Sequence, residues 1–159
     1  MTLVELNTNV VSYVALLRTR GVPLLRDLTH RFDLEFTISE AIAPVDLDPE
    51  DDFHYRWIAL GSKALPEQLA SFQSHAMRVE ALYKRNGDAG PLRITFGYLD
   101  PFKVVRATRE NSMTGIAIGQ GVWAEAVLRK EPGEKFQSRG SSGDIWLNDK
   151  AIKFFNSIL

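Results

Sequence analysis

Cysteine is absent from the sequence. Its absence excludes a disulfide framework, a thiolate zinc site, an iron–sulfur cluster and a cysteine nucleophile. A lack of disulfides is also typical of proteins in a reducing compartment. Long hydrophobic runs are missing too, because the longest apolar stretch, residues 10–17, has 8 residues and includes Ser12, whereas a membrane-spanning helix needs about 20. The first residues carry neither a basic region nor a small-residue cleavage site. We therefore expect no signal peptide, no membrane and a cytoplasmic location.

Charge of one sign is not in excess. The chain has 19 Lys and Arg residues against 20 Asp and Glu residues, which gives a net charge of −1. Nucleic-acid-binding domains usually carry a strongly basic stripe or patch that neutralises phosphates. The sequence shows no comparable excess, so we do not expect nucleic acid to be the partner of this protein.

The motifs of several common active sites are also missing. No histidine pair has the spacing of a zinc protease, and neither a Gly-x-Ser-x-Gly elbow nor a phosphate-binding Walker loop occurs. The acidic segment 46–57 matches a calcium loop only in part. Its sixth position is Asp51 where the loop needs glycine, and its twelfth is Trp57 where the loop needs glutamate. We therefore expect no metal, no cofactor and no catalytic residue.

The residues that are present describe an ordinary folded domain. Of the 159 residues, 45% are hydrophobic and 10% are aromatic, and a chain of this length can bury a core without cross-links. Its length predicts one domain, residues 1–159. The clearest element is 65–85, where apolar side chains recur at helical spacing and Pro66 suits the first turn. This segment predicts an amphipathic helix.

Alternating patterns dominate the middle of the second half. Residues 92–98 alternate apolar and polar side chains, and residues 103–109 form a plausible second strand. Residues 115–118 and 122–129 predict a hairpin that turns through the glycines at 119–121. These segments together predict an antiparallel β-sheet.

The end of the chain combines a loop and a helix. Residues 131–144 contain three glycines, three serines, one glutamine and Pro132, and they predict a mobile surface loop with 141–143 at its tip. Asn148 is a suitable cap for a last helix over 149–158, whose apolar residues recur at helical spacing.

The N-terminal part of the chain allows two folds. Residues 9–17 form either a helix or a β-branched strand of the kind buried inside a sheet. As a helix they would form a helix-turn-helix with 23–32 and with a recognition helix over 35–42. That recognition helix carries Glu35 and Glu40 but no lysine or arginine. Its carboxylates would repel a phosphate backbone.

We prefer the second interpretation, in which 9–17 is a strand, 23–32 is a helix and 33–40 is another strand. The reason is that apolar and polar residues alternate along 33–40. With a further strand at 55–60 and the helix 65–85, the order of elements predicts a split β-α-β arrangement of ferredoxin-like type, extended at the C-terminus. The predicted fold class is α+β, a single domain with a mainly antiparallel sheet and helices on one face. The alternative is an N-terminal helix-turn-helix with a β-rich C-terminal part.

The second half of the chain contains a pattern of short segments. In it, Gly-Tyr-Leu is followed by Lys-Val-Val and then by a Gly-x-Gly-aromatic-Ala-Glu hairpin. The matching residues are Gly97, Tyr98, Leu99, Lys103, Gly119, Gly121, Trp123, Ala124 and Glu125. The pattern resembles a family of short prokaryotic proteins described as a domain of unknown function, most clearly over 92–128. Trp123 stands where the family more usually has tyrosine, and 137–147 departs from the pattern. The resemblance implies the α+β fold but no mechanism, because the family has no established activity.

One group of side chains on the predicted sheet is a candidate ligand site. Trp123, Glu125, Val127 and Arg129 share a face of the strand 122–129. A carboxylate between an aromatic and an aliphatic side chain is partly desolvated and needs a cationic partner. The cationic candidates on neighbouring strands are Arg93, Lys103 and Arg106. The group is either a ligand site in which Glu125 acts as acceptor or base, or a cross-strand salt bridge, and we favour the salt bridge.

These observations suggest three functions. We expect a non-catalytic cytoplasmic binding or assembly module that contacts a protein, a second copy of itself or a small ligand through its sheet face or hairpin edge. The first alternative is a small enzyme of undefined class that uses Glu125, Lys103 and Arg106. The second alternative is a winged-helix DNA-binding regulator.

Overall fold

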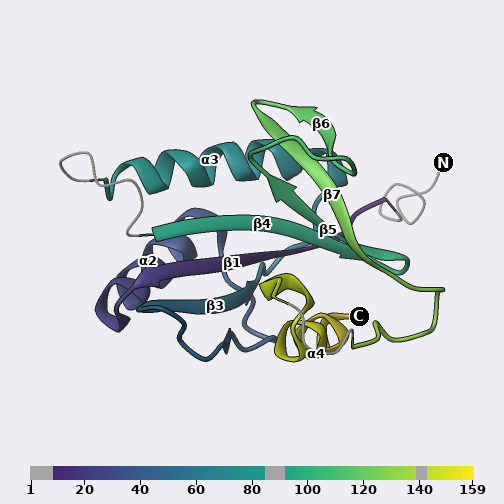
Figure 1. The fold of residues 1–159 in the computed structure, drawn as a ribbon, viewed down its shortest axis with the longest axis horizontal. Helices are drawn as coiled ribbons and strands as arrows, with labels where there is room; N and C mark the ends of the chain where they lie inside the picture. The colour runs from purple at the N-terminus through teal and green to yellow at the C-terminus, as the bar shows by residue number, and fades with distance from the viewer. Residues whose placement is uncertain (1–8, 85–91, 139–142) are drawn as a thin grey trace.

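A computed structural model shows the fold and describes residues 9–84, 92–138 and 143–159. Its strands are β1 (Ser12–Arg20), β2 (Val45–Asp46), β3 (Phe53–Ala59), β4 (Leu92–Asp100), β5 (Lys103–Thr108), β6 (Ile116–Gly119) and β7 (Val122–Arg129). Its helices are α2 (Val22–Phe36), α3 (Leu69–Ala81) and α4 (Asp149–Ile158), with short 3-10 turns η1 (Pro66–Gln68) and η2 (Ile145–Leu147). The strands form one sheet in the order β2-β3-β1-β4-β5-β7-β6, and every paired neighbour is antiparallel (Figure 1).

The first part of the sheet has ferredoxin-like connectivity. The chain order β1-α2-β2-β3-α3-β4 gives the sheet order β2-β3-β1-β4. Strands β3 and β4 are parallel to each other, because each is antiparallel to β1, which lies between them. The helix α3 joins these two strands, so β3-α3-β4 is a split β-α-β unit. Strands β5, β7 and β6 extend the sheet beyond β4, and the predicted α+β class with a mainly antiparallel sheet is confirmed.

The strand β1 lies in the centre of the sheet, between β3 and β4. Val14, Ala15 and Leu17 have no exposed surface, although they point to both sides of the strand. Such apolar side chains on both faces are typical of a strand that is covered on both sides. The alternative of an N-terminal helix-turn-helix is therefore wrong, because its first helix is a central strand.

The predicted strand over 33–40 is also wrong, because α2 continues to Phe36. Phe32 and Phe36 lie one helical turn apart, and both rings contact Phe96 of β4, with centroids 5.6 and 4.8 Å away. Leu34, which the strand pattern counted as apolar and buried, is 71% exposed. The aromatic contacts favour the helix over the local alternation. The strand next to β3 is instead β2, within the acidic segment.

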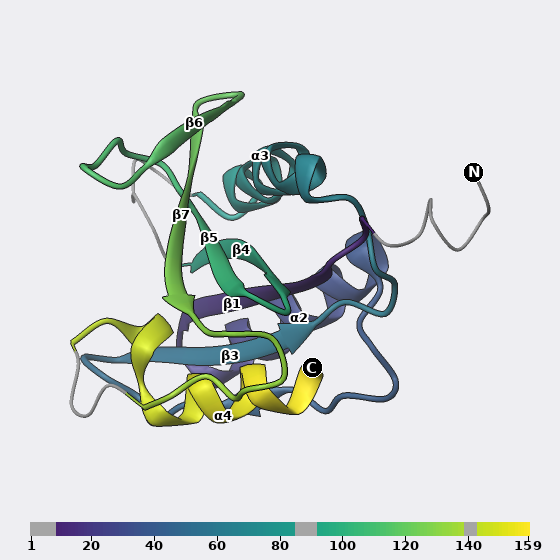
Figure 2. The same cartoon turned by 90° about the vertical axis from the view of Figure 1, so that its right-hand side faces the viewer.

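The helices cover the sheet on two sides (Figure 2). We use "α3 face" for the side that α2 and α3 cover, where the buried residues include Ala15, Leu17, Ile94 and Phe96. The opposite "α4 face" carries a second buried cluster, which includes Val14, Leu16, Trp57, Leu128 and Phe155. The helices of the ferredoxin-like unit thus share one face, and the C-terminal helix adds a layer on the other.

The predicted hairpin and cap are present. Gly119, Gln120 and Gly121 take positive φ angles of 99°, 58° and 72° in the turn between β6 and β7, a conformation that favours glycine. The side chain of Asn148 accepts a hydrogen bond of 2.9 Å from the backbone nitrogen of Ala151 and so caps α4.

The predicted loop 131–144 is anchored in the part that precedes residue 139. Phe136 is buried against the α4 face. Its backbone nitrogen and oxygen bond the side-chain amide of Asn156 at 2.8 and 3.0 Å. The tip predicted at 141–143 lies outside the described residues except for Gly143. Within 131–138 the structure thus shows one contact with the core, through the buried ring of Phe136.

Candidate functional site

The α4 face is apolar at one end and polar at the other. The helix α4 and the turn η2 cover Val14, Trp57 and Leu128. Beyond them the same face carries Arg18 of β1 and Arg93 of β4, because alternate residues of a strand point to the same side. The sheet therefore places charged side chains next to a covered apolar core.

A pocket of about 300 Å³ lies where this polar end meets η2. Its walls come from four strands and from the segment that leads into η2. The lining residues are Leu16, Arg18, Tyr55, Arg93, Thr95, Arg106, Gly143, Asp144, Ile145 and Trp146. We call it the arginine pocket. Its volume is at the lower end of the range for small-molecule sites.

Two of its arginines are direct neighbours. Arg18 of β1 is paired with Arg93 of β4 in the register of the sheet, an arrangement in which like charges destabilise each other. Among the described residues no carboxylate forms an ion pair with either guanidinium. Burial and the neighbouring Arg93 lower the pKa of Arg18. Within the part of the chain that the structure describes, this pair therefore carries positive charge that no ion pair neutralises.

Aromatic side chains of β3 support Arg18. Its guanidinium lies over the ring of Phe53, 4.4 Å from the centroid, which is a cation–π contact. Tyr55 is its direct partner in the β1–β3 register and lines the pocket. The Nε atom of Arg18 is buried and has no hydrogen-bond partner among the described residues. The guanidinium is thus held by packing rather than by an acid.

Arg106 differs from this pair because it has two acidic partners. Its Nη1 donates to both carboxylate oxygens of Asp144, at 2.9 and 2.8 Å. Its Nη2 donates to Oε2 of Glu125 at 3.1 Å, directly across the β5–β7 register. Glu125 also accepts a 2.8 Å hydrogen bond from the Thr114 hydroxyl. This bond and the Arg106 guanidinium hold the pKa of Glu125 below its usual range.

The wall opposite the strands is fixed by Trp146. Asp144 accepts a hydrogen bond of 2.9 Å from the backbone nitrogen of Trp146. The Trp146 ring stands edge-on to Trp57, with centroids 4.6 Å apart, and lies against Gly97 of β4. A Cβ atom at Gly97 would approach this ring to 2.6 Å and the backbone oxygen of Val105 to 2.5 Å. Only glycine leaves room for the tryptophan, so η2 has one defined position over the sheet.

The structure brings some of the predicted site residues together and separates others. Arg93 and Arg106 line the arginine pocket, and Glu125 binds Arg106 from outside it. Trp123 pairs with Thr108 and does not line the pocket.

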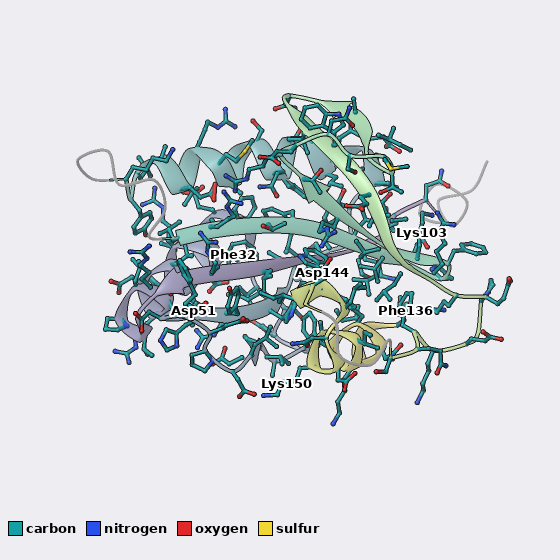
Figure 3. The ribbon with its side chains drawn as sticks, in the orientation of Figure 1. Phe32, Asp51, Lys103, Phe136, Asp144 and Lys150 are labelled. Carbon is teal, nitrogen blue, oxygen red and sulfur yellow. The ribbon has the colours of Figure 1, made fainter. Side chains whose placement is uncertain are left out.

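Lys103 is distant from this group. It forms an ion pair of 2.7 Å with Asp100, and Figure 3 shows it at the far end of β5 from Asp144. The trio of Glu125, Lys103 and Arg106 that the enzyme alternative required does not come together, because Lys103 and Arg106 stand on opposite faces of β5.

A β-bulge changes which residues of β7 share a face. Val104 pairs with Leu128 and Val105 pairs with Ala126, so Val127 has no partner in the ladder. Leu128 belongs to the buried cluster of the α4 face. Trp123 and Glu125 therefore share a face as predicted, whereas Arg129 lies on the other.

Of the pocket's lining residues the sequence analysis named only Arg93 and Arg106, and it missed Arg18, Tyr55 and Asp144 among the others. Arg18 extends the alternation of β1 beyond 9–17 and was detectable from that pattern. Tyr55 was placed on a strand without a role, and Asp144 was assigned to a loop. No sequence signal pairs Asp144 with Arg106, which lies 38 positions away.

Two further findings concern the described residues alone. No group of three side chains that could hold a metal occurs among them. Within the same residues, every helix is too short or too polar to cross a membrane.

The fold and this pocket define an α+β protein of ferredoxin-like connectivity with a cationic site on its sheet. The sequence profile described as "Domain of unknown function (DUF4416)" matches residues 51–158. The chain belongs to this family, which confirms the resemblance found in the sequence. The matched region contains Tyr55, Arg93, Arg106 and Asp144 but not Arg18. No curated protein and no solved structure matches the chain.

Proposed function

We propose that this protein is a non-catalytic binding module that holds the oxyanion of a small ligand, a phosphate or a carboxylate, on Arg18 and Arg93. The observation that carries this proposal is the pairing of these two guanidinium groups across β1 and β4 without an acidic partner among the described residues. An anion between the half-buried Arg18 and the exposed Arg93 would relieve the repulsion of these two like charges.

The charges of the pocket support the same conclusion. The nearby carboxylates of Asp144 and Glu125 both bind Arg106, and among the described residues Arg18 and Arg93 have no ion-pair partner. Guanidinium groups match the planar geometry of carboxylate and phosphate oxygens. Both arginines are on central strands of the sheet, so the site needs little reorganisation to bind.

The test is calorimetric titration of the protein with methyl phosphate and with acetate at constant ionic strength. Replacing Arg93 by Met removes a charge from an exposed side chain and should weaken binding by at least about tenfold, since hydrogen bonds to charged groups contribute about 1.5–3 kcal/mol. Arg20→Met is the matched control, because Arg20, like Arg93, is an exposed arginine of a central strand but does not line the pocket. Equal losses in both variants, or no binding by the unaltered protein, would overturn the proposal.

A second candidate function is self-association by strand addition at β6. This strand is the edge of the sheet, all its residues are exposed, and it carries no charged side chain that would block pairing. Ile116 is 70% exposed. Light scattering should show a dimer that Ile116→Lys converts to a monomer, and a protein that is monomeric at high concentration would exclude this candidate.

A further inference from the structure

We infer that the ligand of the arginine pocket carries its oxyanion on a compact, flat apolar body the size of one aromatic ring. The chemical class is that of aryl or heteroaryl phosphates and carboxylates. This inference rests on the proposed function, and it adds the part of the ligand that Arg18 and Arg93 do not bind.

The two sides of the pocket differ in chemistry. The strands supply Arg18 and Arg93, whereas η2 supplies the side chains of Ile145 and Trp146. Tyr55 stands beside Arg18 in the sheet register and adds an aromatic ring next to the cationic side. Trp146 is already 4% exposed, so a bare inorganic anion would bind the arginines and leave mainly Ile145 and Tyr55 facing water. A ring attached to the anion would cover that side and remove its surface from water.

The size of the pocket agrees with one ring. Water occupies about 30 Å³ per molecule in the liquid, so a pocket of about 300 Å³ has room for about ten non-hydrogen atoms. An inorganic phosphate fills about half of that space. Benzoate, with about nine non-hydrogen atoms, and phenyl phosphate, with about eleven, both come close to this number, whereas a much larger ligand would extend into solvent.

The apolar side is rigid before the ligand binds. Asp144 connects η2 to Arg106 and to the Trp146 backbone. The Trp146 ring is in turn held between Trp57 and Gly97. Arg106 is therefore a positioning residue, which holds the turn that carries Ile145, while Arg18 and Arg93 meet the anion. A preformed wall favours a rigid ligand of matching shape.

The experiment compares methyl phosphate with phenyl phosphate, and acetate with benzoate, by calorimetric titration of the full chain. Each pair has the same anionic group and differs in the ring. We expect the aromatic member to bind at least about tenfold more tightly, since about 60 Å² of buried apolar surface already gives this factor.

Variants separate the two halves of the site. Ile145→Ala should weaken phenyl phosphate several-fold and leave methyl phosphate unchanged, whereas Arg93→Met should weaken both. Leu34→Ala, at an exposed apolar side chain of α2 that does not line the pocket, is the control and should change neither. Thermal melting of each variant shows that it is folded.

The outcomes are distinguishable. Equal affinity for the two members of each pair, or an equal loss of both phosphates in Ile145→Ala, overturns the inference and leaves the proposed oxyanion site intact. Absence of binding by all four probes overturns the proposed function together with the inference.

Discussion

The strands β4 and β5 carry an arginine–carboxylate cluster on each face, and the two clusters are neutralised to different degrees. Under α3, Arg109 binds both carboxylate oxygens of Glu80 at 2.5 and 2.6 Å, and the Glu80 side chain is 7% exposed. Glu80 also accepts a 3.1 Å hydrogen bond from the Ile94 backbone nitrogen. On the α4 face, Arg106 serves two half-exposed carboxylates, and two further arginines stand nearby without an acid.

The difference separates a structural charge pair from a binding site. The Glu80 cluster joins α3 to β4, and each of its charges has a partner of opposite sign. A buried pair of this kind costs desolvation and must be fully satisfied. The α4-face cluster borders a pocket and has an excess of positive charge. An unbalanced cluster on rigid strands is the arrangement that a ligand can complete.

The largest expected effect is the difference in stability between two alanine substitutions, one at the carboxylate of each cluster. Glu80→Ala should lower the free energy of unfolding by about 3 kcal/mol, because it leaves Arg109 and the Ile94 amide without their acceptor in a buried place. Glu125→Ala should cost about 1 kcal/mol or less, because its pair with Arg106 is partly exposed. Urea denaturation measures both values, and similar losses would contradict the comparison.

Gly97→Ala should have the next largest effect. The added methyl group would collide with Trp146 and with the Val105 carbonyl, so we expect a loss of about 2 kcal/mol from overpacking. Tryptophan fluorescence should change as the ring moves. Gly61→Ala is the control, because its Cβ would lie 3.5 Å from the nearest atom, the Ile38 oxygen. A Gly97→Ala variant as stable as the unaltered protein would show that η2 is not fixed as described.

Asp144→Asn tests the charge balance of the α4-face cluster. It removes a negative charge from the pocket and should raise the affinity for methyl phosphate several-fold, since like charges no longer oppose each other. Stability should fall by about 1 kcal/mol, because an ion pair with Arg106 is weakened. Titration and urea denaturation of the same sample measure the two effects. A lower affinity would mean that Asp144 helps to bind the anion.

The smallest expected effect is the pH dependence that Glu125 contributes. Its pKa is lower in the folded protein than in the unfolded chain, where a glutamate has a pKa of about 4.3. Its contribution to stability is therefore complete above that value and is lost as pH falls through the folded pKa. Between about pH 5 and 2 the unaltered protein should lose more stability than Glu125→Gln. Parallel curves would contradict the pKa shift.

The parts of the fold that sequence could predict are those in which one pattern allowed one structure. Residues 92–98 alternate cleanly and form a strand, as predicted. The segment around Phe36 was ambiguous, because Phe32 and Phe36 fit a helix while Phe36 and Ile38 fit a strand. Contacts with Phe72 and His75 of α3 and with Phe96 of β4, all distant in the sequence, decide between them.

In the candidate site, the sequence could predict a pair of side chains on neighbouring strands but not the wall that η2 forms over the pocket. The cross-strand pair of Arg106 and Glu125 follows from alternation on neighbouring strands. The bulge at Val127 has no sequence signal, yet it moves Arg129 to the other face. The wall depends on Asp144 and Trp146, whose position is set by tertiary packing on Gly97 rather than by local pattern.

The strands β4 and β5 separate beyond the pair of Gly97 and Arg106, and there side chains of α3 take the place of a strand. Gln73 bonds the Phe96 nitrogen and the Ile94 oxygen at 2.8 and 2.9 Å, and Glu80 bonds the Ile94 nitrogen. The amide hydrogens of Ile94 and Phe96 are therefore exchangeable only when α3 lifts from the sheet. Their exchange rates would report the opening of this helix as a unit, separately from the unfolding of the ladder between β1 and β3.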